Sequence, residues 1–262
     1  EETVWSEDGK EVGWISIMMA GYREKSYLIL PMNYYLYGGL AGAAVFLAEL
    51  TDKTKKRKYH YLTTVLVRQL FRYTDDLYQK ETSEKLPTGA YAGETSVAFA
   101  YILLYQVSGN RIFLTYLRKQ CQVAAGWLAE DGEYDILDGN AGAILVFLNA
   151  YRLTGEEQYL AWARDAGDAL LRSATAYEYG IGWVNRSLGA ALTGFAHGTA
   201  GIMLALARLG HDTQEERYLE AAYQAYQYEE HYFREEAQDW EDLRYEGGVA
   251  VESRRMAWPW HG

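Results

Sequence analysis

The chain has 262 residues, of which 49% are hydrophobic and 23% are charged, as is typical of a globular protein with one large domain or two small ones. Its formal net charge is −11, and no basic cluster offsets it, which argues against a nucleic-acid-binding or membrane-binding surface. No apolar run has the length of a membrane span and no signal peptide is visible, so we expect a cytoplasmic protein.

Two local features have ordinary explanations. The single cysteine, Cys121, excludes an internal disulfide and favours a reducing compartment. Because Cys121 lies in a helical pattern, we expect it to be a small buried hydrophobic residue rather than a nucleophile. The basic run 53–58 is interpreted as a solvated turn between two helices.

Residues 1–30 mix tryptophans, charges and a short apolar run, and they give no clear pattern. After Pro31 a pattern begins and then recurs: a glycine-rich turn, a short apolar helix, a polar turn and a longer amphipathic helix. We therefore divide the chain into a lead-in segment, 1–30, and a repeated domain, 31–262.

The last glycine of each turn is Gly42, Gly93, Gly142 or Gly201. A period of about 50 residues with this content is the signature of repeated helical hairpins. The expected short helices are 43–50, 95–105, 143–153 and 202–209. The expected longer helices are 58–78, one that ends at residue 128, 158–172 and 215–233.

The short helices are apolar nearly all round, so they must be enclosed, whereas the longer ones carry charge on one face. This pattern predicts an all-α fold with inner and outer helices, an α/α toroid rather than an open solenoid. Each glycine turn then lies at the N-terminal end of an inner helix, and these ends meet at one mouth of the toroid. Asp135, Asp138 and His197 are therefore expected to share a pocket.

His197 lies between flexible glycines directly before an apolar helix, where a ligand can approach closely and the helix dipole adds positive potential. A histidine near a carboxylate can act as a general acid or base at neutral pH. Asp138 suits a cap or turn role, whereas capping explains Asp135 less easily. His60 and His211 are expected to be structural.

These residues leave other interpretations open. The turn that contains His197 can be purely structural. A glycoside hydrolase is a second candidate, because α/α toroids host such enzymes, although Asp135 and Asp138 form too local a pair for the two carboxylates of that reaction. A peptide-binding scaffold without catalysis is a third.

Four motifs resemble the lanthionine synthetase cyclases, and in particular the C-terminal cyclase domain of class II lanthipeptide synthetases. They are Leu36-Tyr-Gly-Gly-Leu-Ala-Gly42, Asp135-Ile-Leu-Asp-Gly-Asn-Ala-Gly142, Gly194-Phe-Ala-His-Gly-Thr-Ala-Gly-Ile202, and Tyr228-Glu-Glu with Asp239-Trp-Glu-Asp-Leu-Arg244. Their order along the chain is that of the family.

The resemblance implies a cyclase that adds cysteine thiols to dehydroalanine or dehydrobutyrine in a dehydrated precursor peptide, forming thioether rings. It places the family's catalytic aspartate and histidine at Asp135 and His197. It also implies Arg255 and Trp258 as substrate-binding residues, and an N-terminal dehydratase domain as a fusion partner in the full protein.

The resemblance further implies a zinc ion that binds the substrate thiol, since a zinc-bound thiol is deprotonated. The family's first cysteine ligand falls on Pro259 or Trp260, neither of which can bind zinc, and its later Cys-His-Gly motif lies beyond Gly262. We therefore expect no zinc in this chain as given. Three explanations fit the missing zinc ligands. The favoured one is that the sequence is truncated. The second is a zinc-independent relative, such as the cyclase domain of class III synthetases, and the third is a degenerate scaffold that only binds peptide.

Overall fold

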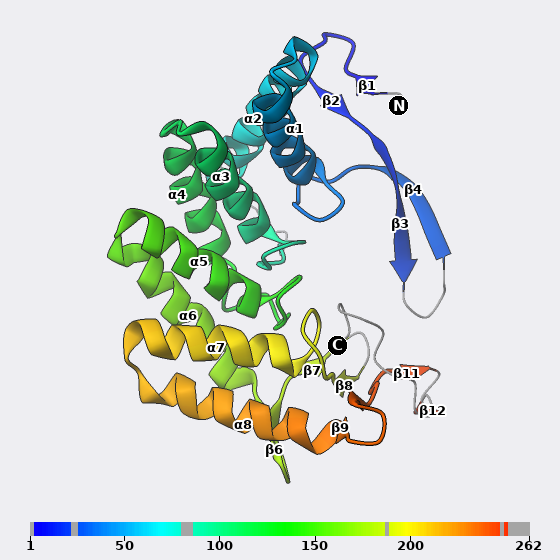
Figure 1. Ribbon diagram of the computed structural model, residues 1–262, viewed down its shortest axis with the longest axis vertical. Helices are drawn as coiled ribbons and strands as arrows, with labels where there is room; N and C mark the ends of the chain where they lie inside the picture. Colours follow the sequence, from blue (N-terminus) through cyan, green and yellow to red (C-terminus); the bar gives the residue numbers. More distant parts are fainter. Residues whose placement is uncertain (1–2, 22–25, 80–85, 187–188, 247–248, 251–262) are drawn as a thin grey trace. The chain divides into compact units, whose positions relative to one another are not determined.

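The structure, a computed structural model, describes residues 3–21, 26–79, 86–186, 189–246 and 249–250. Helices make up most of the described chain and alternate in direction as hairpins (Figure 1). The helices are α1 (Leu40–Thr54), α2 (Arg57–Gln79), α3 (Glu94–Ser108), α4 (Ile112–Ala125), α5 (Asn140–Thr154), α6 (Glu157–Ser173), α7 (Thr199–Thr213) and α8 (Glu216–Tyr232).

The chain forms two compact units. The first comprises Glu1–Leu86 and Tyr91–Ala124, and it contains α1, α2, α3 and nearly all of α4. The second comprises Pro87–Ala90 and Ala125–Gly262, and it contains α5 to α8. The division at residue 31 that the sequence suggested stays a prediction.

The fold is of the α/α-toroid class, and helices that bury most of their residues, such as α3 and α5, alternate with amphipathic helices, such as α2 and α6. The expected difference in length is absent from the second hairpin, where α3 has 15 residues and α4 has 14. In α5, Ile144 and Phe147 are fully buried, and α7 buries Leu206 and Leu209 equally well. In the second unit, α5 packs against both α6 and α7, and α7 packs against α8. No helix in the described parts of the chain combines the length and apolar character that crossing a membrane requires.

The inner helices begin earlier than the sequence analysis placed them. Gly42, Gly142 and Gly201 are the third residues of α1, α5 and α7, not the last residues of a turn. A Cβ at each would lie 2.0–2.2 Å from the carbonyl oxygen of the residue six positions earlier. These glycines are therefore needed because the preceding loop folds back onto the first helical turn.

The expected end of the fourth short helix at residue 209, before a turn at Gly210, is wrong. Helix α7 continues through Gly210 to Thr213, and Gln214 ends it with a left-handed conformation at φ 58°. A Cβ at Gly210 would lie 2.8 Å from Cδ2 of Leu219 in α8. Gly210 therefore permits close packing of two helices rather than a turn.

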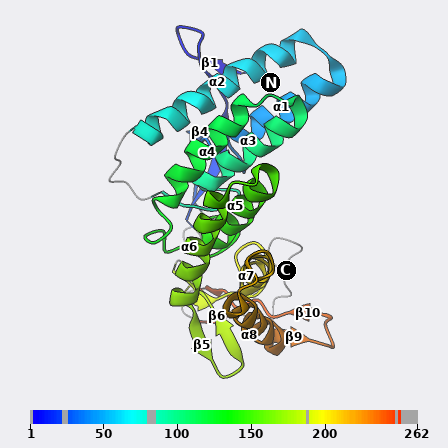
Figure 2. The same cartoon turned by 90° about the vertical axis from the view of Figure 1, so that its left-hand side faces the viewer.

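Short antiparallel strand pairs accompany the helices, and the sequence analysis did not predict them. In the described residues each pair forms a two-stranded sheet, and Figure 2 shows β5 and β6 as a projecting hairpin beside α8. The strands are β1 (Val4–Trp5), β2 (Val12–Gly13), β3 (Ile15–Gly21), β4 (Ser26–Pro31), β5 (Thr175–Tyr177), β6 (Gly180–Gly182), β7 (Val184–Asn185), β8 (Ala190–Ala191), β9 (Phe233–Arg234), β10 (Asp239–Trp240), β11 (Tyr245–Glu246) and β12 (Val249–Ala250).

Candidate functional site

Asp135 lies in the loop that leads into α5, and the loop is tied to its own backbone. The Asp135 carbonyl accepts hydrogen bonds from the amides of Gly139 (3.2 Å) and Gly142 (3.1 Å). Its carboxylate oxygen Oδ1 accepts the amide of Asp138 at 2.8 Å. Only 5% of the Asp135 side chain is exposed, so the remaining oxygen, Oδ2, is held in a fixed direction.

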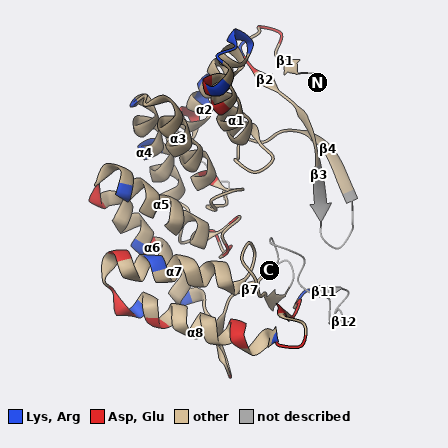
Figure 3. Ribbon diagram, in the orientation of Figure 1, with Lys and Arg blue, Asp and Glu red and all other residues tan. Residues whose placement is uncertain are grey.

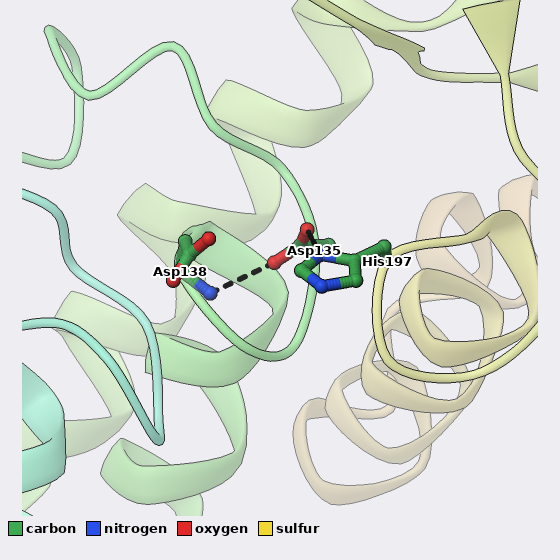
Figure 4. Close-up of side chains that lie close together, drawn as sticks. All are labelled: Asp135, Asp138 and His197. Atoms are coloured by element: carbon green, nitrogen blue, oxygen red, sulfur yellow. Dashed lines mark hydrogen bonds and ion pairs between the residues drawn. The ribbon is translucent and has the colours of Figure 1, made fainter. Parts of the chain in front are cut away.

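That direction is toward His197, in the loop before α7. Asp135 Oδ2 lies 2.7 Å from His197 Nδ1, across 62 residues of sequence (Figure 4). One quarter of the His197 side chain is exposed. With Nδ1 engaged by the carboxylate, Nε2 is the ring nitrogen through which a substrate proton can be exchanged.

Asp138 completes what we call the acid–base cluster: Asp135, Asp138 and His197. One ligand atom of each residue lies within 4.8 Å of the others. The three residues that the sequence analysis expected to share a pocket are therefore together, within the second unit. Carboxylates with one imidazole can exchange a proton or hold a cation.

The acid–base cluster favours a protonated histidine. Burial alone would lower the pKa of His197, but the hydrogen bond that its Nδ1–H donates to Asp135 and the charges of Asp135, Asp138 and Glu133 outweigh it. The pKa of His197 is therefore raised above its ordinary value. The neutral ring is therefore a stronger base than an ordinary histidine, and the imidazolium that it forms can return the proton.

The neighbouring carboxyl groups are shifted as well. Burial, followed by the charge of Asp135, raises the pKa of Asp138 to about 6. Burial and the same charge raise the pKa of Glu133, although Arg186 and His197 act in the opposite direction. Asp138 therefore titrates closer to neutral pH than an ordinary aspartate does, directly beside the imidazole of His197.

Glu229, in α8, belongs to the Tyr228-Glu-Glu motif, but the sequence analysis gave it no role at this site. Its carboxylate accepts the amide of Gly194 at 3.2 Å and also accepts the amide of Ala200. Those amides lie three residues before and three residues after His197. Glu229 is 5% exposed, and burial raises its pKa to about 8. It positions the His197 loop through the backbone.

A second unexpected group supports the Asp138 side of the cluster. The hydroxyl of Thr88 is hydrogen-bonded to Asp131 and, at 2.9 Å, to Asn140 at the start of α5. Burial raises the pKa of Asp131 to about 7. Gly89, which follows Thr88 in the chain, donates its amide hydrogen to the Asp138 carbonyl at 2.7 Å. Polar residues scattered along a sequence give no periodic signal, so these contacts were not predictable.

The sequence matches the family model for the lanthionine synthetase C-like protein over residues 30–260. The chain belongs to the lanthionine synthetase C-like family. A search of curated protein sequences finds no match.

Solved structures share the fold at low sequence identity. A D-mannose isomerase has a TM-score of 0.55 and 11% identity over 84% of this chain and 66% of that one. The cellobiose 2-epimerase of Bacillus thermoamylovorans B4167 has a TM-score of 0.51 and 12% identity over 87% and 69%. Nisin cyclase has a TM-score of 0.47 and 16% identity over 75% and 50%. The chain thus spans about two thirds of the first two structures and half of the third.

A zinc site of the kind that the family resemblance implies cannot be built from these residues. Such a site takes two cysteine ligands, whereas this lanthionine synthetase C-like chain has one cysteine. Cys121 is fully buried within α4, as the sequence analysis expected, and burial raises the pKa of its thiol. Cys121 is therefore unsuited to bind a metal or to attack a substrate.

The remaining expected residues fall in different places. Arg255 and Trp258, the expected substrate-binding residues, lie outside the described residues, as do Pro259 and Trp260. His211 is 81% exposed and pairs with Asp212 at 3.0 Å.

Proposed function

We propose that this chain is the cyclase part of a lanthionine synthetase, which adds cysteine thiols of a dehydrated precursor peptide to dehydroalanine or dehydrobutyrine. The observation that carries the proposal is the partly buried hydrogen bond between Asp135 and His197 in a chain of the lanthionine synthetase C-like family. Thiol addition to a dehydro residue moves one proton from sulfur to carbon, which is work for a single acid–base residue.

The proposed reaction uses His197 twice. Nε2 first accepts the thiol proton, and the sulfur adds to Cβ of the dehydro residue, which leaves an enolate on the adjacent carbonyl. The imidazolium then returns the proton to Cα. One C–S bond forms, the Cα–Cβ double bond becomes single, and the proton moves from sulfur to carbon, so that no oxidant or second base is needed.

Asp135 keeps the imidazole in one tautomer and stabilises the imidazolium between the two steps, as a buried carboxylate does for a histidine base. Asp138 adds negative potential beside the ring, which favours the same charged form. A bound zinc ion would supply the same activation by lowering the pKa of a coordinated thiol. Residues 1–262 contain one cysteine, and the proposal assigns thiol activation within these residues to His197.

The proposal has a direct test. The purified chain is incubated with a synthetic peptide that contains one dehydroalanine and one cysteine, and free thiol is followed together with thioether formation. His197→Ala and Asp135→Ala should slow the reaction by about 10²-fold or more, with circular dichroism unchanged. His211→Ala, on the exposed histidine, is the matched control and should be neutral. Wild-type rates in both cluster variants would overturn the assignment.

The sugar-converting enzymes that share this fold motivate a second candidate, chemistry on a carbohydrate. Three carboxyl groups beside an imidazole are also suited to proton transfer on a sugar, including the glycoside hydrolysis considered from the sequence. Turnover of oligosaccharides, mannose or cellobiose without any thioether formation would favour that candidate. Peptide binding without either reaction would favour the non-catalytic scaffold.

A further inference from the structure

The turn between α1 and α2 carries a concentration of positive charge that is unusual for this acidic chain. Figure 3 shows lysine and arginine gathered where α1 ends and α2 begins. A cavity of about 790 Å³ opens beside this turn, within the first unit. We call it the cationic groove; it is lined by Ala48, Thr51, Asp52, Lys55, Arg57, His60, Thr63, Thr64, Val67, Arg68, Phe71, Val107, Ser108, Asn110 and Phe113.

One face of α2 forms a wall of the cationic groove. Arg57, His60, Thr64, Arg68 and Phe71 recur at intervals of three or four residues, so they lie on one side of the helix. Among the described residues, the side chains of Arg57, His60 and Arg68 take part in no hydrogen bond or ion pair, and all three are exposed. The positive charges of Arg57 and Arg68 are thus not neutralised within the described chain.

The opposite wall adds little negative charge. Asp52 is the one carboxylate among the described lining residues. It is already paired with Lys53 at 3.2 Å and with Lys55 at 2.8 Å. The net charge of the cationic groove is therefore positive, in a chain whose formal net charge is −11.

The floor of the cationic groove is apolar. Phe71 stacks on Tyr116 with ring centroids 3.7 Å apart and also contacts Phe113. Val67 and Val107 line the same space. Cations around an apolar floor complement a ligand that carries both carboxylates and apolar side chains.

We propose that the cationic groove is a docking site for an acidic peptide segment that also carries aliphatic or aromatic side chains. A volume of about 790 Å³ suits a segment of a few residues. The overall negative charge of the chain opposes longer polyanions such as nucleic acids. In the first unit the groove lies at the C-terminal ends of α1 and α3, whereas the glycine turns lie at their N-terminal ends. The proposal concerns binding alone and does not depend on thioether formation.

The test uses the full chain and a fluorescein-labelled peptide of alternating glutamate with leucine or phenylalanine, followed by fluorescence anisotropy. The double variant Arg57→Ala/Arg68→Ala should weaken binding at least 10-fold. Lys56→Ala/Lys58→Ala is the matched control: it removes two charges from the same turn but none from the groove lining, and it should weaken binding less than 2-fold. Thr64→Glu, which adds a negative charge to the wall, should weaken binding without removing a cation.

Three outcomes would overturn the proposal. Equal losses in the two double variants would show non-specific attraction to the basic turn. Equal binding of a peptide with serine in place of the apolar residues would show that the floor has no role. Tighter binding of a decathymidine oligonucleotide than of the peptide would point to nucleic acid instead.

Discussion

Oδ2 of Asp135 lies 2.7 Å from Nδ1 of His197, and Asp135 is nearly inaccessible to solvent. The two loops that carry these residues each precede an inner helix, and those helices, α5 and α7, pack against each other. The hydrogen bond therefore joins two repeats of the hairpin pattern. It also gives His197 a defined tautomer, because one nitrogen is committed to a carboxylate.

Replacing Asp135 by Asn should lower the pKa of His197, because the carboxylate supplies the hydrogen bond and the nearest charge that raise it. A histidine whose pKa is higher in the folded than in the unfolded chain stabilises the fold. This stabilisation is complete below the unfolded-state pKa, about 6.5, and is lost as the pH rises through the folded-state pKa. The stability of Asp135→Asn should therefore depend less on pH across this window.

The pKa of His197 is measured by NMR titration of the ring protons in wild type and Asp135→Asn. The resonances of the other four histidines are the internal reference and should not respond to the substitution. An unchanged His197 titration in the folded variant would contradict the assignment of Asp135 as the main partner.

Asp138 is ionised in the folded chain only above about pH 6, whereas an aspartate in an unfolded chain ionises near pH 3.9. Keeping its charge at neutral pH therefore costs stability. Asp138→Asn should raise the free energy of unfolding at pH 7 by about 1–3 kcal/mol. The gain should shrink as the pH falls from 6 to 4. Urea unfolding at pH 7 and at pH 4.5 measures the difference, and a gain that is equal at both values would refute it.

Glu229 should matter for its acceptor oxygens rather than for its charge. Glu229→Met removes the acceptor for the amides of Gly194 and Ala200, and two unsatisfied buried amides cost about 2–4 kcal/mol. Glu229→Gln keeps an acceptor of the same shape and should stay within about 1 kcal/mol of wild type. In the Met variant the pKa of His197 should also move, because the loop on both sides of it is released.

The neighbouring Glu230→Gln is the control for Glu229, since Glu230 is exposed on the same helix. Thermal unfolding measures stability, and NMR titration of His197 separates positioning from bulk stability. A Met variant that unfolds like wild type and leaves the titration of His197 unchanged would show that Glu229 does not position the loop.

The sequence predicted the helical hairpins because enclosed helices are apolar all round, and this produces a strong pattern with a long period. It also predicted that Asp135 and His197 lie together, because both precede inner helices of successive repeats. Gly142 was expected to end a turn, but it lies in the first turn of α5, where the carbonyl of Ile136 leaves no room for a Cβ. The sequence pattern shows that a glycine recurs at this position, but not which of these two reasons requires it.

Other features of the site were not assigned from the sequence. Glu229 lies in the Tyr228-Glu-Glu motif, but the motif does not show that its carboxyl group accepts backbone amides of the His197 loop. Thr88 contacts single side chains of distant segments, and such contacts leave no periodicity. The strand pairs in the first 31 residues were not predicted. Their strands contain two to seven residues, and so few residues do not show a clear alternation of apolar and polar side chains.

The stereochemistry of the thioether product tests the central claim most directly. If His197 returns the proton to Cα from one face, the wild-type chain forms one lanthionine diastereomer from the dehydroalanine peptide. His197→Ala should then form both diastereomers in comparable amounts and more slowly, because water protonates the enolate from either face. A product of the His197→Ala variant with the single configuration of wild type would contradict the assignment of His197 as the proton donor.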